Sequence, residues 1–166
     1  MPTLAVSALG LDRPGIIAAV AERLAAHGAN VTDSRMAILR GHFSMMLIVE
    51  GAEREPLAAD LGALGLEAWS VTEVAEAARH PRSRPTAVVS VHGADHPGIL
   101  SAVTRELAAG GANVCDLQTR LVEDLYVMVI DVAVPPELEG LDERLQAVAE
   151  EQGVKLTLRP VDTDVL

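Results

Sequence analysis

Apolar and polar residues alternate along several short stretches of the first half of this chain, and two other stretches carry apolar residues at helical spacing. The predicted strands span 3–9, 29–39, 43–51 and 66–74, and the predicted helices span 16–27 and 55–64. Ile16, Val20 and Leu24 form the apolar stripe of the first helix, which Gly28 ends. Gly62 interrupts the second, weaker helix. The strand at 29–39 alternates like a half-buried strand.

The second half of the chain repeats this pattern. Residues 6–33 align without a gap on residues 89–116, with 17 identities in 28 positions. The register continues past these identities and places Phe43 on Tyr126. Such a match indicates an internal duplication. The second copy is predicted to carry its apolar helical stripe at Ile99, Leu100, Val103 and Leu107, its second helix at 141–153 and its last strand at 154–161.

Each copy follows the order β-α-β-β-α-β. This order predicts an α+β fold of two ferredoxin-like βαββαβ domains, each with a four-stranded antiparallel sheet and both helices on one face. We place the first domain at 1–76, a linker at 77–85 and the second domain at 86–166. The strands carry apolar residues on both sides, so the uncovered sheet faces and edges need a partner, and we expect a homodimer.

Composition narrows the class of protein. The chain of 166 residues has a formal net charge of −11 and a single cysteine, Cys115. A surface this acidic repels phosphate groups, so direct contact with nucleic acid or anionic lipid is disfavoured. No apolar run approaches the roughly 20 residues of a membrane span, and the N-terminal residues lack the features of a signal peptide. We therefore expect a cytoplasmic protein without membrane association.

One short phrase, DRPGI at 12–16 and DHPGI at 95–99, follows the first strand of each copy. A free amino acid is a zwitterion, so its receptor needs donors beside the carboxylate and acceptors beside the ammonium group. The amides that open a helix lack partners and suit a carboxylate, and each glycine lets a ligand approach the backbone. Asp12 and Asp95 offer acceptors, and the asparagines that open the second strands can donate and accept.

The same residues also have a structural interpretation. Asp12 and Asp95 can cap their helices, the prolines suit a first helical turn, and the asparagines can close a tight turn. The duplication does not decide between these interpretations, because both copies share structural requirements. Arg13 is replaced by His96 in the second copy, so the two loops present different charge and need not bind the same ligand.

The DRPGI phrase after a first strand, the helix ending in GANV and the β-α-β-β-α-β order resemble the ACT domain, a small module that binds amino acids and regulates metabolic proteins. Tandem ACT chains of this length are similar to the glycine cleavage system transcriptional repressor family. Residues 12–30 also resemble the leading ACT segment of formyltetrahydrofolate deformylases, which need a further catalytic domain where this chain has its second copy.

In the ACT family, ligands are typically held between the loop of one domain and the neighbouring edge of another. The resemblance assigns ligand contact to Asp12, Arg13, Pro14, Gly15, Ile16 and Asn30 in the first copy and to Asp95, His96, Pro97, Gly98, Ile99 and Asn113 in the second.

Other chemical features are weak. His92 and His96 lie four residues apart, but in a segment with glycine and proline, where the helical geometry of a shared metal site is missing. Cys115 has no matched histidine base and is expected to be a small buried residue. No phosphate-binding loop or catalytic motif occurs. We therefore expect no enzyme activity, no cofactor and no metal.

The sequence thus predicts an amino-acid-binding regulatory protein that passes its ligand state to an unidentified protein partner. By resemblance the ligand is glycine or serine. Two alternatives stay open: a structural adaptor whose loops bind nothing, and a small enzyme that uses His92 or His96 as a base.

Overall fold

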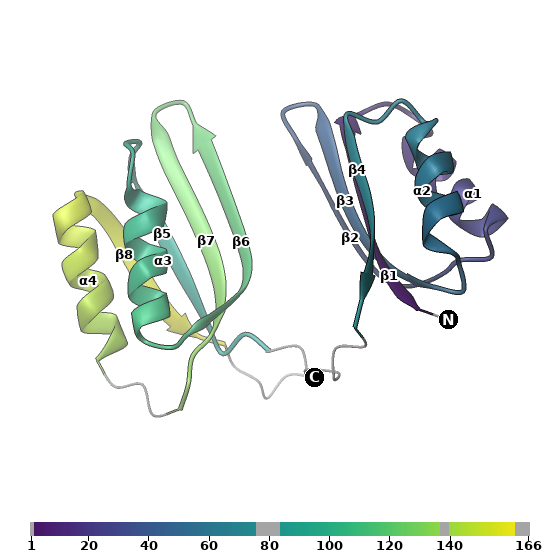
Figure 1. Cartoon of the computed structure of the whole chain (residues 1–166). Helices are drawn as coiled ribbons and strands as arrows, with labels where there is room; N and C mark the ends of the chain where they lie inside the picture. The colour runs from purple at the N-terminus through teal and green to yellow at the C-terminus, as the bar shows by residue number, and fades with distance from the viewer. Residues whose placement is uncertain (1, 76–83, 137–139, 162–166) are drawn as a thin grey trace. The chain divides into compact units, whose positions relative to one another are not determined.

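The computed structural model describes residues 2–75, 84–136 and 140–161. The chain divides into two compact units, Met1–Arg79 and His80–Leu166 (Figure 1). Residues 77–83 of the predicted linker lie outside the described residues. None of the helices in the described ranges is long and apolar enough to cross a membrane.

Both units follow the predicted order of elements. The first contains β1 (Thr3–Leu11), α1 (Ile16–Ala26), β2 (Asn30–Leu39), β3 (His42–Glu50), α2 (Arg54–Gly62) and β4 (Ala68–Val74). The second contains β5 (Ala87–Ala94), α3 (Ile99–Ala109), β6 (Asn113–Val122), β7 (Leu125–Ala133), α4 (Leu141–Gln152) and β8 (Val154–Pro160).

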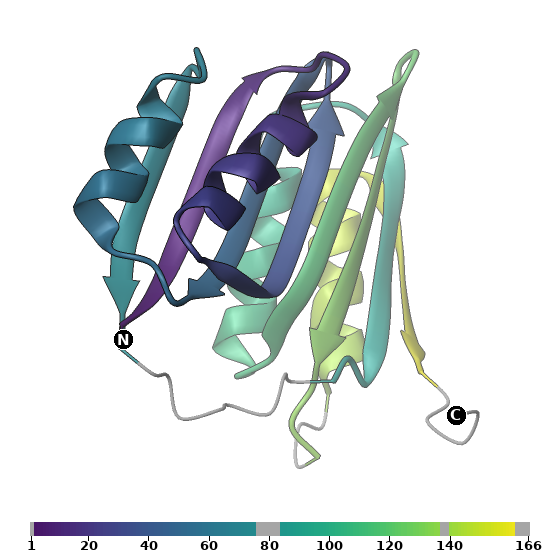
Figure 2. The same cartoon turned by 90° about the vertical axis from the view of Figure 1, so that its right-hand side faces the viewer.

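The strand pairs confirm the predicted α+β, ferredoxin-like architecture. The sheets have the orders β2-β3-β1-β4 and β6-β7-β5-β8, with antiparallel pairs throughout. In each unit the two helices lie side by side on one face of the sheet (Figures 1 and 2). The first strand is central in both sheets, so the loop that leaves it lies near the middle of the sheet end.

The core of each unit lies between the helices and the central strands. Leu4 and Val6 of β1 are fully buried and pack with Val20 and Leu24 of α1. Complete burial of such a side chain stabilises a fold by about 1.5–3 kcal/mol. One predicted core residue is wrong: Leu100 of α3 is 42% exposed, because it falls on the helix face that points away from the sheet.

The second strand differs from the expectation of a half-buried strand. All ten residues of β2 are exposed. β2 is an edge strand, and the helix layer covers the central part of the sheet. Met36, Ile38 and Leu39 therefore expose apolar surface along this edge.

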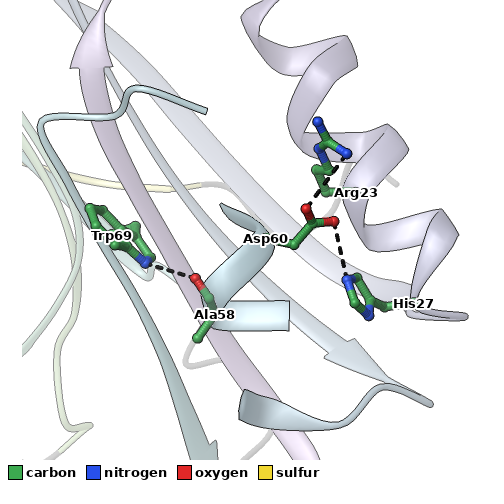
Figure 3. A network of polar contacts seen from close by, with 5 residues as sticks. All are labelled: Arg23, His27, Ala58, Asp60 and Trp69. Carbon is green, nitrogen blue, oxygen red and sulfur yellow. Dashed lines mark hydrogen bonds and ion pairs between the residues drawn. The ribbon is translucent and has the colours of Figure 1, made fainter. Parts of the chain in front are cut away.

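α2 ends at Gly62 instead of continuing to residue 64, and Trp69 accounts for the glycine. A β-carbon at position 62 would lie 2.7 Å from Cζ2 of the indole. The Trp69 Nε1–H donates a hydrogen bond to the Ala58 carbonyl oxygen at 3.1 Å (Figure 3). The single tryptophan thus packs directly on the last turn of α2.

Charged side chains link the two helices within each unit. In the first unit, Asp60 of α2 lies 3.6 Å from Nη1 of Arg23 on α1 and 3.2 Å from Nε2 of His27, the C-cap residue of α1 (Figure 3). In the second unit, Arg144 Nε of α4 lies 3.4 Å from Glu106 Oε1 of α3.

Candidate functional site

The loop between β1 and α1 is tied down at two points in the first unit. The Asp12 main-chain N–H donates to the Gly41 carbonyl oxygen at 2.8 Å, which joins the loop to the β2–β3 turn. The Arg13 guanidinium donates through Nη2 to the Leu64 carbonyl oxygen at 3.0 Å, just beyond α2. Gly15, which precedes α1, has open space where a β-carbon would stand. The loop is therefore fixed at its start and open at the beginning of the helix.

The equivalent loop in the second unit is held by His96. The imidazole Nε2 lies 2.7 Å from the Gln152 carbonyl oxygen and Nδ1 lies 3.2 Å from the Pro97 carbonyl oxygen. The Gln152 carbonyl raises the pKa of His96 most, and the Pro97 carbonyl and the Asp95 carboxylate raise it further, against the opposing effect of desolvation. The loop thus favours an imidazolium.

Both helices of the two loops begin with a glycine and not with an acidic cap. Gly15 and Gly98 are the N-cap residues, with φ of 87° and 110°, and neither helix start has a side-chain cap hydrogen bond. The alternative that Asp12 and Asp95 cap their helices is therefore wrong. Positive φ explains why both positions are glycine. Within the described ranges, neither carboxylate takes part in a hydrogen bond or a salt bridge, so both remain available as acceptors.

Asn30 lies at the opposite end of the sheet from the Asp12 loop. Asn30 pairs with Glu50 at one end of β3, whereas Leu11, the residue before Asp12, pairs with His42 at the other end. The nine residues of β3 separate these ends by roughly 26 Å at a rise of about 3.3 Å per residue. One unit cannot bring the loop and this asparagine to the same ligand.

The second unit repeats this separation. Asn113 pairs with Ala133 at one end of β7, and Ala94, which precedes the loop, pairs with Leu125 at the other. Arg13, Pro14, Gly15 and Ile16 stay with Asp12, and His96, Pro97, Gly98 and Ile99 stay with Asp95, since each set is continuous in the chain. The predicted site residues therefore form one loop cluster per unit and one distant asparagine.

The asparagines are not needed to close the preceding turn. In the first unit, the Gly28 N–H donates to the Ala25 carbonyl oxygen at 2.9 Å and the Ala29 N–H to the Leu24 carbonyl oxygen at 2.9 Å. These two bonds close the helix end through main-chain groups alone. Within the described ranges the Asn30 side chain makes no hydrogen bond.

The structure adds little support for a role of His92 or Cys115 or for a metal site. His92 is an exposed residue of β5 that pairs with Lys155 of β8. Cys115 lies at a β-bulge of β6 and is partly buried, not fully buried as expected. No group of three or more metal-binding side chains occurs among the described residues.

Sequence reasoning missed the groups that anchor the loops, because these are main-chain carbonyls of Gly41, Leu64 and Gln152 and carry no residue-type signal. It also missed a shallow depression on the uncovered face of the second sheet. Asp116, Gln118, Val129 and Asp131 line this depression. Asp116 and Asp131 are direct register partners in neighbouring strands, which the spacing within one strand does not reveal.

Comparison with known proteins matches both copies of the repeat. A family model described as the ACT domain matches residues 2–67 and again residues 85–159. The glycine cleavage system transcriptional repressor of Escherichia coli is 29% identical over 121 residues, which cover 70% of this chain and 64% of the repressor, just under two-thirds of its length. A UPF0237 protein of Methanococcus maripaludis is 33% identical over 75 residues, which cover 43% of this chain and 83% of that protein.

Solved structures show the same fold over nearly the whole chain. A protein of unknown function from Galdieria sulphuraria has a TM-score of 0.78 and 30% identity, with 96% of this chain and 98% of that chain covered. A structure provisionally assigned to the glycine cleavage system transcriptional repressors has a TM-score of 0.68 and 19% identity, with 96% and 97% covered. The duplicated fold, the two glycine-started helices and the double match of the family model together place this chain in the ACT domain family, as a tandem protein related to the glycine cleavage system transcriptional repressor.

Proposed function

We propose that this protein binds a small amino acid, glycine or serine, at the two loops and transmits the bound state through contact with a protein partner. ACT domains bind small amino-acid ligands and regulate partners, and the relationship to the glycine cleavage system repressor suggests glycine, serine or one-carbon metabolism. The observation that carries the proposal is the repeated pairing of a carboxylate that makes no hydrogen bond or salt bridge among the described residues with a glycine-capped first helical turn, at Asp12 and Gly15 and again at Asp95 and Gly98.

The loop offers complementary groups for both ends of a zwitterion. The first-turn amides of a helix lack intrahelical partners and lie at the positive end of the helix dipole, so they suit the ligand carboxylate. In α1 the Ile16 N–H donates to the Arg13 carbonyl oxygen at 3.3 Å, so the amides after Ile16 would serve the ligand there. The carboxylate of Asp12 or Asp95 accepts from the ammonium group. Asn30 and Asn113 can join such a site only when another ACT unit brings them to the loop, and we propose that a second copy of the chain supplies that unit in a homodimer.

The alternatives receive less support. A general base needs a free ring nitrogen, and both nitrogens of His96 face main-chain carbonyl oxygens. The related proteins suggest a regulator and not an enzyme. The net charge of −11 favours a protein partner over DNA as the target of the signal. A structural adaptor with empty loops is separated from a sensor by the binding experiment below.

Isothermal titration calorimetry with glycine and serine tests the proposal. The variants Asp12→Asn and Asp95→Asn keep the shape of the side chain and remove the negative charge. Loss of a hydrogen bond to a charged group costs about 1.5–3 kcal/mol, so we expect each variant to lower the ligand affinity of its own loop about 10- to 100-fold. Glu22→Gln, at an exposed position of α1, is the matched control and should leave binding unchanged.

A ligand without the ammonium group sharpens this test. Acetate retains the carboxylate but has no N–H or O–H donor for the aspartate, so it should bind weakly to the unmodified protein, and neither variant should weaken its binding further. If no proteinogenic amino acid gives a binding signal in calorimetry, the result supports a structural adaptor whose loops bind nothing. Unchanged glycine or serine affinity in the Asp12→Asn, Asp95→Asn double variant contradicts the assigned site.

A further inference from the structure

The two loops are fastened to the same part of their units by different side chains. Arg13 donates to the Leu64 carbonyl oxygen at 3.0 Å, two residues beyond the end of α2. His96, at the same position of the repeat, lies 2.7 Å from the carbonyl oxygen of Gln152, the last residue of α4. Each loop is thus tied by its second residue to the C-terminal end of the second helix.

The chemistry of the two fasteners differs. An arginine is charged at every physiological pH, so Arg13 always has N–H groups to donate. The two ring nitrogens of His96 both face carbonyl oxygens, of Gln152 and of Pro97, and a carbonyl oxygen can only accept. A neutral imidazole has one N–H and an imidazolium has two, so only the protonated ring satisfies both contacts.

We propose that His96 is a proton-controlled latch, which holds the loop of the second unit firmly to the end of α4 when protonated and more weakly when neutral. The neutral ring can keep the Nε2–H bond to Gln152, but it loses the bond to Pro97 and the positive charge. Arg13 fastens the first loop at all physiological pH values. The first loop has a further anchor, the bond from the Asp12 N–H to Gly41, and among the described residues the Asp95 N–H makes no matching bond. The second loop therefore depends more strongly on its latch.

Weakening of the contact between His96 and the end of α4 directly affects the start of α3. Gln152 Oε1 lies 3.5 Å from the position that a β-carbon on Gly98 would occupy, so the end of α4 adjoins the N-cap residue of α3. The carbonyl of Gln152 is one of the last four of its helix, which lack intrahelical partners and lie at the negative end of the dipole. A cation held there fastens the N-cap region to α4.

The charged groups around His96 favour the protonated ring. Asp95 on the loop contributes to the raised pKa, after the two carbonyls. The ionisable residues that neighbour the loop contacts in sequence or register are exposed: Glu123 and Asp124 on the β6–β7 turn, Glu150 and Glu151 beside Gln152 on α4, and Lys155 on β8, which pairs with His92. Because the pKa is raised in the folded state, the contribution of the latch to stability is complete below the unfolded value of about 6.5 and is lost as pH rises through the folded value.

NMR titration of the full-length protein tests the latch without any amino-acid ligand. The His96 ring resonances, assigned by their loss in His96→Arg, should titrate above the value of about 6.5 for an unstructured histidine. Hydrogen-exchange protection of the first hydrogen-bonded amides of α3, beginning with the Ala102 N–H that donates to the Gly98 carbonyl oxygen at 2.8 Å, should fall several-fold over the same pH range after correction for intrinsic exchange rates. A His96 titration at or below about 6.5 overturns the proposal.

Three variants separate the latch from general effects of pH. His96→Arg should keep α3 protected at high pH, Arg13→His should transfer the pH dependence to α1, and His92→Gln, a histidine of the same unit outside the latch, should change nothing. Unchanged pH dependence in His96→Arg overturns the proposal. If the amino-acid affinity of the second loop varies with pH while that of the first loop stays constant, the latch also controls the proposed function. If neither loop binds any amino acid, the proposed function is wrong, and the NMR titration alone decides whether the latch exists.

Discussion

The two units share one architecture, but the ion pair between their helices is reversed. Arg23 on α1 faces Asp60 on α2, whereas Glu106 on α3 faces Arg144 on α4. Arg23 and Glu106 occupy the same position of the repeat. The duplication has therefore retained the place of the bridge and exchanged its sign. The reversed signs disfavour an exchange of helices between units. If α1 packed against α4, Arg23 would meet Arg144, and if α3 packed against α2, Glu106 would meet Asp60; like charges repel in both cases.

The units also differ in their aromatic residues. The only tryptophan of the chain, Trp69, lies in the first unit, with its indole against the last turn of α2. Tryptophan emission therefore reports the packing of the first unit alone, and far-ultraviolet circular dichroism reports both. The difference between the copies supplies a probe that distinguishes the unfolding of one from the unfolding of the other.

The largest expected effect comes from matched truncations in the two cores. Leu24 and Leu107 occupy the same repeat position and are 2% and 0% exposed. Leu24→Ala or Leu107→Ala should each cost its unit about 2–5 kcal/mol, because the substitution removes buried methyl groups and leaves a cavity. In urea titrations, Leu24→Ala should lower the midpoint of the transition followed by tryptophan emission. Leu107→Ala should lower only the midpoint followed by circular dichroism.

Exposed positions of the same helices provide the control. Glu22→Gln and Arg105→Gln lie one turn or less from the truncated leucines, at exposed repeat-equivalent sites, and should change stability by no more than about 0.5 kcal/mol. If Leu107→Ala moves the tryptophan transition as far as Leu24→Ala does, the two units unfold together and tryptophan emission does not report the first unit alone.

A smaller effect is expected at a pair of glycines on the inner face of the central strands. A β-carbon on Gly93 would lie 2.8 Å from Val154 Cγ1 and 3.1 Å from Val154 Cα, whereas one on Gly10 would lie 3.2 Å from the ring edge of Phe43. Backbone cannot move aside as a ring can. Gly93→Ala should therefore destabilise its unit by about 1–3 kcal/mol, and Gly10→Ala by less, in the same urea titrations.

A double-mutant cycle identifies the clash as the cause. Val154→Ala removes the nearest side-chain atoms, so its combination with Gly93→Ala should cost less than the sum of the single changes. Strict additivity, or a larger loss for Gly10→Ala than for Gly93→Ala, would contradict the geometric explanation.

Much of this architecture could be predicted from the sequence because the duplication places the same periodicity twice in view. The element order, the glycine turns and the start of α1 at Ile16 follow from local pattern. The need for glycine at position 62 does not, since it depends on contact with Trp69 from another element. The exposure of β2 likewise depends on its place at the sheet edge, which periodicity does not specify.

The candidate site was predictable only in part. The loops around Asp12 and Asp95 could be found because their five-residue phrase recurs. The separation from Asn30 could not, because it follows from strand order: β1 and β2 run in the same direction, each paired antiparallel to β3, so the end of one lies opposite the start of the other. The anchors of Arg13 and His96 were hidden for a different reason, since main-chain carbonyls occur at every residue.

The smallest effect is expected for the reversed ion pairs, and it tests the comparison most directly. These side chains are partly exposed, with 44% and 32% for Arg23 and Asp60 and 40% and 25% for Arg144 and Glu106. Arg23→Glu or Glu106→Arg should each cost only about 0.2–1 kcal/mol, because water and salt screen the charges. Added salt should reduce both losses, as thermal unfolding at two ionic strengths would measure.

Reversing both charges in one unit should restore stability unequally. In the second unit, Glu106→Arg with Arg144→Glu recreates the pair, and the position equivalent to His27 is Gly110, which carries no charge. In the first unit, Arg23→Glu with Asp60→Arg also removes the acid that lies 3.2 Å from His27 Nε2 and puts a cation there. Restoration should therefore be nearly complete in the second unit and incomplete in the first. Equal restoration in both units would mean that His27 contributes nothing to the helix contact and that the two bridges are equivalent apart from sign.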